Sequence, residues 1–160
     1  MAIEDTLNGA RNAFTINFKY LNEVAHEIGL ERAIALHAKV CEAMGATQGK
    51  MIKKRSKLKE IDAKSAHPLA RSVIEEGFGI SSEVMDESPE KVVLKLGKCP
   101  VYEACVVVGL NNEAIETLCR SSSCGFMSAM VKQLNPNLNF QVRKFRSDAD
   151  NFCEEVIVMD

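Results

Sequence analysis

The apolar residues of this chain first change their spacing close to residue 79, and this change constrains the fold more than any single motif. Before it, they recur at roughly the 3.6-residue period of amphipathic helices. This period predicts helices over residues 3–28 and 30–58. A third helix is predicted to begin near Pro68, because proline is tolerated in a first helical turn, and to end before Gly77.

The second of these helices contains two glycines. Gly45 and Gly49 each weaken a helix interior by about 1 kcal/mol relative to alanine, unless close packing against another helix needs them small. The inner side of this helix is expected to consist of Ala33, Leu36, Val40, Met44, Met51 and Ile52.

After residue 79 the spacing becomes that of β-strands. Alternation on both sides of a turn predicts a hairpin over residues 80–97. Helical spacing returns over 100–108 and 112–134 and ends before Pro136, since proline disfavours helical geometry in the residue that precedes it. A second hairpin is predicted over residues 138–158.

This order predicts an α+β fold in one domain of residues 1–160. Hairpins favour antiparallel pairing, so N-terminal helices are expected to pack on one antiparallel sheet made of two hairpins that flank a helical segment. Residues 1–78 form the helical part and residues 79–160 the hairpin–helix–hairpin part, which carries most of the cysteines.

Charge and composition argue against several classes of protein. The formal net charge is −2, and there is no Trp to stack on bases, so a nucleic-acid partner is not expected. The basic run from Lys50 to Lys59 is read as a solvated helix face. No apolar run approaches the roughly 20 residues that span a membrane, and the first residues do not resemble a signal peptide. A cytoplasmic protein with reduced cysteines is expected.

Five of the six cysteines lie between Cys99 and Cys153. Thiols this dense in a chain without an export signal usually indicate chemistry or metal binding. The alternative is that they pack as small hydrophobic residues, as free cysteines often do. The valines that follow Cys105 favour packing as a small hydrophobic residue for this cysteine. Cys119 and Cys124 would point away from each other on a continuous helix, and converge only if Ser121–Ser123 breaks it.

The phrases around these cysteines resemble the L-2-amino-thiazoline-4-carboxylic acid hydrolase-like family. The residues that carry the resemblance are Cys99, Pro100, Tyr102, Glu103, Cys119, Asn135, Pro136 and Cys153. The same region is distantly similar to the 4-vinyl reductase domain, through Cys124–Phe126 and the closing hairpin. That domain shares its fold with subunits of the TRAPP trafficking complex. The resemblance therefore implies an apolar, ligand-holding cavity between helices and sheet, and a homodimer.

The resemblance also selects candidate site residues. Cys99, Cys119 and Cys153 match the family pattern and could hold Zn or an iron centre, with Cys124 as a further ligand if the helix breaks. His37 could complete the set, although a half-buried histidine beside Cys41 is the simpler interpretation. Glu103 could act as a general base, or be an exposed acid of a first helical turn.

Three functions remain open from the sequence. The first is a hydrolase that opens a cyclic amidine or thiazoline carboxylate, with Cys119 and Glu103 as catalytic residues and Arg120 or Arg143 holding the substrate carboxylate. The second is a sensory domain that binds a small molecule or a metal without turnover. The third is a structural dimerisation module with inert thiols.

Overall fold

The computed structural model describes residues 3–160, which form helices on one face of an antiparallel sheet. The first half contains α1 (Ile3–Ile28), α2 (Leu30–Ser56), α3 (Ala63–Arg71) and the π-helical turn η1 (Ser72–Gly77). The second half contains β1 (Ser82–Glu87), β2 (Lys91–Leu96), α4 (Pro100–Val107), α5 (Asn112–Leu118), η2 (Cys119–Ser123), α6 (Cys124–Leu134), β3 (Leu138–Lys144) and β4 (Cys153–Met159). The predicted α+β class is confirmed.

The sheet joins the two predicted hairpins. Its strand order is β1-β2-β4-β3, with every neighbouring pair antiparallel. The inner strands are therefore β2 from the first hairpin and β4 from the second. Their register sets Leu96 opposite Cys153 and Leu94 opposite Glu155.

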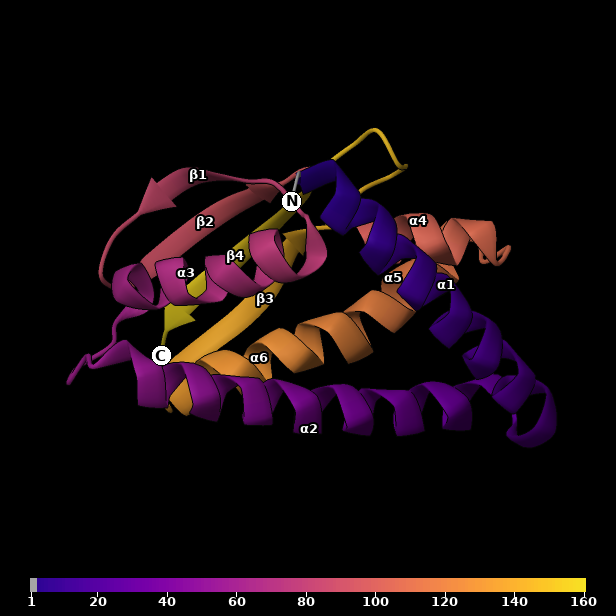
Figure 1. The fold of residues 1–160 in the computed structure, drawn as a ribbon, viewed down its shortest axis with the longest axis horizontal. Coiled ribbons are helices and arrows are strands. Elements are labelled where there is room, and N and C mark those ends of the chain that lie inside the picture. The colour runs from indigo at the N-terminus through magenta and orange to yellow at the C-terminus, as the bar shows by residue number, and fades with distance from the viewer. Residues whose placement is uncertain (1–2) are drawn as a thin grey trace.

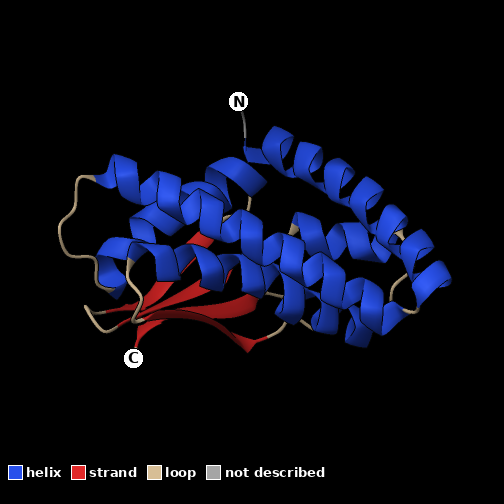
Figure 2. Cartoon of the chain, turned by 90° about the horizontal axis from the view of Figure 1, so that it is seen from below, coloured by secondary structure: helices blue, strands red, loops and turns tan. Residues whose placement is uncertain are grey.

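The helices form a layer over one face of this sheet, as Figure 2 shows from below. In Figure 1, α2 and α6 lie side by side, α3 crosses the sheet, and α1 lies against α4 at the other end of the molecule. On the uncovered face, charged pairs such as Lys91–Asp86 and Arg143–Glu154 surround the buried Val93 and Val156. The main core lies between sheet, α3 and α6.

The third helix begins earlier than the sequence predicted. Asp62 caps it by accepting a hydrogen bond from the Ser65 N–H, while Ser65 Oγ accepts one from the Asp62 N–H. This capping box satisfies two backbone donors that a helix start leaves free. The helix consequently begins at Ala63, and Pro68 lies inside it rather than in its first turn.

The prediction of which residues form the inner side of α2 is wrong for most of those residues. Ala33 is buried and Ile52 is partly buried, but Val40 and Met44 are 62% and 59% exposed, and Leu36 and Met51 are exposed too. The face that packs instead carries the two glycines. A Cβ atom on Gly45 or Gly49 would collide with the backbone oxygens of Phe126 and Met130 in α6.

The glycine contact between α2 and α6 generates a test. We expect Gly45→Ala and Gly49→Ala each to lower the free energy of unfolding by about 1–3 kcal/mol, because the added methyl groups force the helices apart. Gly9 in α1 is the matched control, since a Cβ there meets no atom within 4 Å. Gly9→Ala should stabilise the protein by about 0.5–1 kcal/mol through helix propensity alone. Urea unfolding measures all three. Stabilisation by Gly45→Ala would contradict the close contact.

Candidate ligand cavity and its polar inner end

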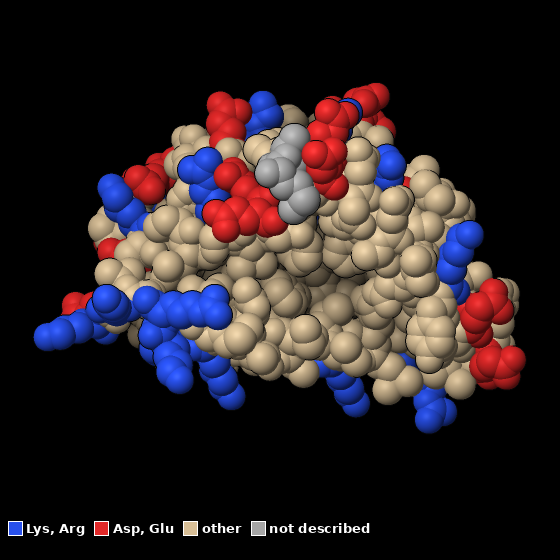
Figure 3. All heavy atoms as spheres, in the orientation of Figure 1, with Lys and Arg blue, Asp and Glu red and all other residues tan. Residues whose placement is uncertain are grey.

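A cavity of about 590 Å³ lies under α1 and α2 and reaches the inner face of the sheet. An apolar cavity of about 150 Å³ is enough for a benzene-sized ligand, so this one accepts a considerably larger molecule. Figure 3 shows a hollow between α1 and α2 that is bordered by uncharged side chains. Three of the exposed apolar residues of α2 belong to this opening: Leu36, Val40 and Met44 line the cavity.

Basic side chains gather elsewhere on the surface. Figure 3 shows Lys and Arg side chains over the C-terminal end of α2 and the loop after it. The residues of the run from Lys50 to Lys59 are mostly exposed. This agrees with the prediction of a solvated helix face.

Five cysteines line the cavity. They come from α2, the β2–α4 connection, η2, α6 and β4, and they are Cys41, Cys99, Cys119, Cys124 and Cys153. The sixth, Cys105, is fully buried in the cluster that joins α1 to α4 and α5, as its valine-rich setting predicted. The structure thus brings the three family cysteines to one cavity because the two hairpins are neighbours.

Cys119 and Cys124 converge because the helix changes its winding between them. The N–H of Cys124 donates to the carbonyl of Cys119, five residues earlier, which makes Cys119–Ser123 a π-helical turn. Such turns are common at functional sites. The two thiols now interact, and Cys124 is the first cause of the raised pKa of Cys119. The helix does not break at the three serines, as convergence was expected to require; it continues through them with π-helical winding.

Burial keeps the cavity thiols protonated. It raises the pKa of Cys99 to about 12 and is also the main reason that the pKa of Cys153 is raised. The Arg146 guanidinium opposes this shift at Cys153, because its Nε–H donates to the sulfur at 3.3 Å, but burial outweighs it. A thiolate is the nucleophilic form of cysteine. These thiols are therefore neutral at physiological pH.

The predicted metal centre receives no support from this arrangement. Among residues 3–160, no group of three or more His, Cys, Asp and Glu side chains is placed to hold a metal ion. Metal binding requires deprotonated thiols, whereas those of Cys99, Cys119 and Cys153 have raised pKa values. The Zn or iron centre remains a prediction, and no chemical step is derived through it.

His37 lines the cavity but both of its ring nitrogens have partners. Nε2 lies 3.0 Å from the Asn17 amide, and Nδ1 lies 2.9 Å from Ser122 Oγ. Cys41 Sγ is a further 3.7 Å neighbour of Nδ1. Burial lowers the pKa of the imidazole, so the neutral form predominates. His37 therefore links α1, α2 and η2, in agreement with the simpler of its two interpretations.

Glu103 lies outside the cavity. It is in the first turn of α4, and its carboxylate pairs with Arg11 of α1 at 3.4 Å. Tyr102, its neighbour, does line the cavity and donates its hydroxyl to Asn112. The structure consequently places Glu103 as a surface acid that ties α4 to α1, and gives it no access to a ligand in the cavity.

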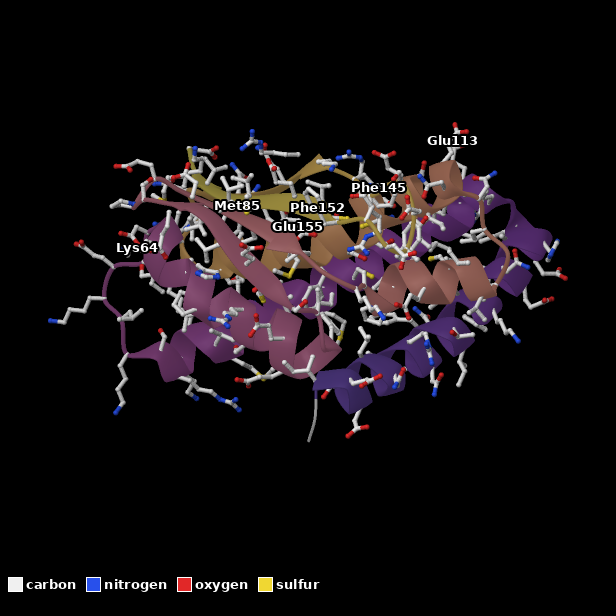
Figure 4. The ribbon with its side chains drawn as sticks, turned by 90° about the horizontal axis from the view of Figure 1, so that it is seen from above. Lys64, Met85, Glu113, Phe145, Phe152 and Glu155 are labelled. Atoms are coloured by element: carbon white, nitrogen blue, oxygen red, sulfur yellow. The ribbon has the colours of Figure 1, made fainter. Side chains whose placement is uncertain are left out.

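Glu155 is a cavity carboxyl that the sequence analysis missed. Its neighbours across the strands are Leu94 on β2 and Val142 on β3, both buried. Figure 4 shows it on β4, near Phe152 and the end of the sheet that approaches α4 and α5. Burial raises its pKa from 4.5 to about 8, and Arg146 only partly offsets this rise. Alternation from Cys153 to Ile157 would have placed Glu155 on the inner face.

Among residues 3–160, Arg146 is the one Lys or Arg side chain that lines the cavity, and the sequence analysis missed it too. It is 1% exposed, and its Nη2 donates to the Gly97 carbonyl at 2.6 Å. Two other arginines had been expected to hold a substrate. Arg120 pairs with Glu116, and Arg143 pairs with Glu154 on the other face of the sheet, and neither lines the cavity.

Comparisons with known proteins agree with this architecture. The family model described as L-2-amino-thiazoline-4-carboxylic acid hydrolase matches residues 10–155. Among solved structures, the chain is similar to a trafficking protein particle complex subunit 3 from Naegleria fowleri, which is covalently bound to palmitic acid. The TM-score is 0.59 at 13% identity, with 95% of each chain covered, so this likeness concerns the fold. No curated protein matches the chain.

The raised pKa of Glu155 predicts how stability depends on pH. The unfolded chain loses this proton near pH 4.5, whereas the folded protein keeps it until about pH 8. The folded state binds more protons between these values, so this residue lowers stability as pH rises through that window. Glu155→Gln should therefore stabilise the protein by about 4 kcal/mol more at pH 9 than at pH 4.5.

The matched control for this measurement is Glu154→Gln. Glu154 is the adjacent residue, on the opposite face, and loses only an exposed ion pair with Arg143. Its effect should stay below about 1 kcal/mol at both pH values. Equal pH dependence in the two variants, measured by urea unfolding, would contradict a desolvated Glu155.

Proposed function

The chain belongs to the L-2-amino-thiazoline-4-carboxylic acid hydrolase family, and we propose that it hydrolyses a cyclic amidine carboxylate at the inner end of its cavity. The observation that carries this proposal is Glu155, a carboxyl with a pKa of about 8 inside an apolar cavity. A general acid–base group works best when its pKa lies near the working pH. Glu155 meets this condition, whereas the partly buried Glu103 pairs with Arg11 and does not line the cavity.

The proposed reaction needs one proton donor and one proton acceptor. Protonated Glu155 donates to the ring nitrogen and so makes the amidine carbon more electrophilic. Its other oxygen accepts a proton from the water that adds to this carbon. As the tetrahedral adduct collapses, its hydroxyl proton passes through the Glu155 carboxyl to the ring nitrogen. The ring carbon–nitrogen bond breaks, the nitrogen leaves as an amine, and the carbon becomes a thiocarbamate carbonyl.

Water is a better candidate nucleophile than Cys119. Attack by this thiol would require its proton to move to a base, and its pKa is raised well above 9. The Glu155 carboxylate, with a pKa of about 8, is a weaker base than that thiolate. The electrostatic influence of Glu155 on Cys119 indicates that the two groups are close. Cys119 is therefore assigned to contact the substrate as a neutral thiol.

A turnover assay with L-2-amino-thiazoline-4-carboxylate tests this function. We expect Glu155→Gln to lower kcat by about 10²–10⁴-fold, the usual contribution of a general acid–base group. Cys119→Ser should retain most of the activity, and Glu103→Gln should behave like the wild type. The wild-type rate should fall above about pH 8, where Glu155 loses its proton. Full activity in Glu155→Gln would overturn the assigned role.

A second function is favoured by the size and lining of the cavity. A five-membered ring acid fills only a small part of about 590 Å³ of mainly apolar space. The similar trafficking subunit is covalently bound to palmitic acid. A protein that holds an apolar ligand without turnover would have this cavity. Absence of thiazoline turnover, together with an apolar ligand detected by mass spectrometry of the purified protein, would favour this function over the hydrolase.

Two further expectations concern a membrane and a second copy of the chain. No helix in residues 3–160 is both long and apolar enough to cross a membrane. Exposed apolar side chains on α1 and α4, including Ile16, Tyr20 and Val107, are compatible with the predicted homodimer. The homodimer and the structural dimerisation module remain predictions.

A further inference from the structure

The guanidinium of Arg146 is a buried cation for which residues 3–160 supply no counterion. Its Nε–H donates to Cys153 Sγ and its Nη2 donates to Gly97 O. Its Nη1 is buried and has no hydrogen-bond partner. Its Cζ also lies 5.6 Å from the centre of the Tyr102 ring. No ion pair within the described residues includes Arg146.

Such an arrangement is unfavourable unless something else neutralises the charge. An isolated buried charge is strongly destabilising, and an unmet buried donor adds to this penalty. Two acids of the chain are close enough to influence Arg146. Glu155 is neutral below about pH 8, and Asp148 is exposed and accepts hydrogen bonds from the Asp150 and Asn151 N–H groups. Arg146 therefore lacks an anion, and the cavity that it lines is the place from which one can come.

We propose that Arg146 binds the carboxylate of the cavity's ligand, and that this ligand is an amphiphilic monocarboxylate whose apolar body extends beneath α1 and α2. The inference shares its cavity with the proposed hydrolase and rests on that function only for the identity of the reacting ring. In the hydrolase, Arg146 orients the substrate through its carboxylate and favours substrates with an apolar substituent.

The charge and the lining of the cavity define this ligand class. Arg146 is the single Lys or Arg among the lining residues, which suits one negative charge rather than a phosphate dianion. The rest of the lining is mainly apolar and extends from Leu96 and Phe140 on the sheet to Leu36, Val40 and Met44 at the opening. A ligand with only a carboxylate would leave the apolar lining uncovered. A ligand with only a hydrocarbon chain would leave the Arg146 guanidinium without an anion.

Calorimetric titration of the full chain with four probes tests the proposal. Decanoate has both a carboxylate and a long apolar chain. Decanol and decylamine have the chain without the carboxylate, and acetate has the carboxylate without the chain. We expect decanoate to bind at least about tenfold more tightly than each of the others, since a charge-assisted hydrogen bond contributes about this much. Equal affinity for decanoate and decanol in the wild type would overturn the proposal, whatever any variant shows.

Two variants locate the anion-binding group. Arg146→Gln should weaken decanoate binding at least about tenfold and leave decanol binding nearly unchanged. Arg146→Lys keeps the charge but not the fork of donors, and should retain part of the preference for decanoate. Arg143→Gln is the matched control, because Arg143 lies in the same segment but on the opposite face of the sheet. Loss of the preference in Arg143→Gln, or its survival in Arg146→Gln, would contradict the assignment.

The same titration separates this inference from the proposed function. Glu155→Gln removes the proposed acid–base group but leaves Arg146 in place. Its preference for decanoate over decanol should persist. A protein that binds decanoate through Arg146 but does not turn over thiazoline carboxylate supports the anion site and refutes the hydrolase. Turnover that continues unaffected in Arg146→Gln refutes the anion site and leaves the hydrolase standing.

Discussion

The antiparallel pairing of β2 with β4 brings together two hairpins that the whole helical segment from Pro100 to Leu134 separates in the sequence. The register of this pairing decides which side chains of β4 face the helices. It sets Cys153 opposite Leu96 and Glu155 opposite Leu94, on the inner face. A shift of one residue would turn Glu154 inward in their place, because side chains alternate along a strand. The polar inner end of the cavity depends on this register.

The cavity itself depends on how the helices are held above that sheet. The glycine face of α2 packs closely on α6, so the larger apolar residues of α2 are turned away from this contact. Phe18 and Leu21 of α1 pack with Val101 and Ile115 in a separate cluster at the other end of the molecule. The helix α2 thus packs mainly on α6, whereas α1 packs on α4 and α5. Leu36, Val40 and Met44, which a helix in a simple core would bury, border an opening instead.

Desolvation sets the chemical character of the cavity. It holds Cys99 and Cys153 as thiols and raises the pKa of Glu155, while Arg146 stays charged because a guanidinium does not lose its proton. The result is a neutral acid beside an unpaired cation in an apolar space. A neutral carboxyl can donate a proton, and the cation can hold an anion. In the roles proposed above, the two groups have separate tasks toward one ligand that carries a carboxylate.

The sequence by itself determined the elements and their class. Period, turn residues and prolines are local signals, so the helices and hairpins could be predicted from them. The resemblance pointed to the half of the chain that contributes four of the five cysteines lining the cavity. The face of α2 that packs on α6 could not be predicted, because it carries glycines, which form no hydrophobic stripe. The start of α3 was missed because Pro68 outweighed the capping signal at Asp62.

Only the tertiary structure decided which charged residues line the cavity. Glu154 and Glu155 are identical in type and adjacent in sequence, yet one forms a surface ion pair and the other lines the cavity. Arg146 follows a strand in a polar, turn-rich segment that reads as exposed. Glu103, beside the family's Cys-Pro turn, pairs with Arg11 and does not line the cavity. The physical reason is that desolvation arises from the packing of distant segments. Periodicity records local geometry, and it does not reveal which neighbours exclude water from a given side chain.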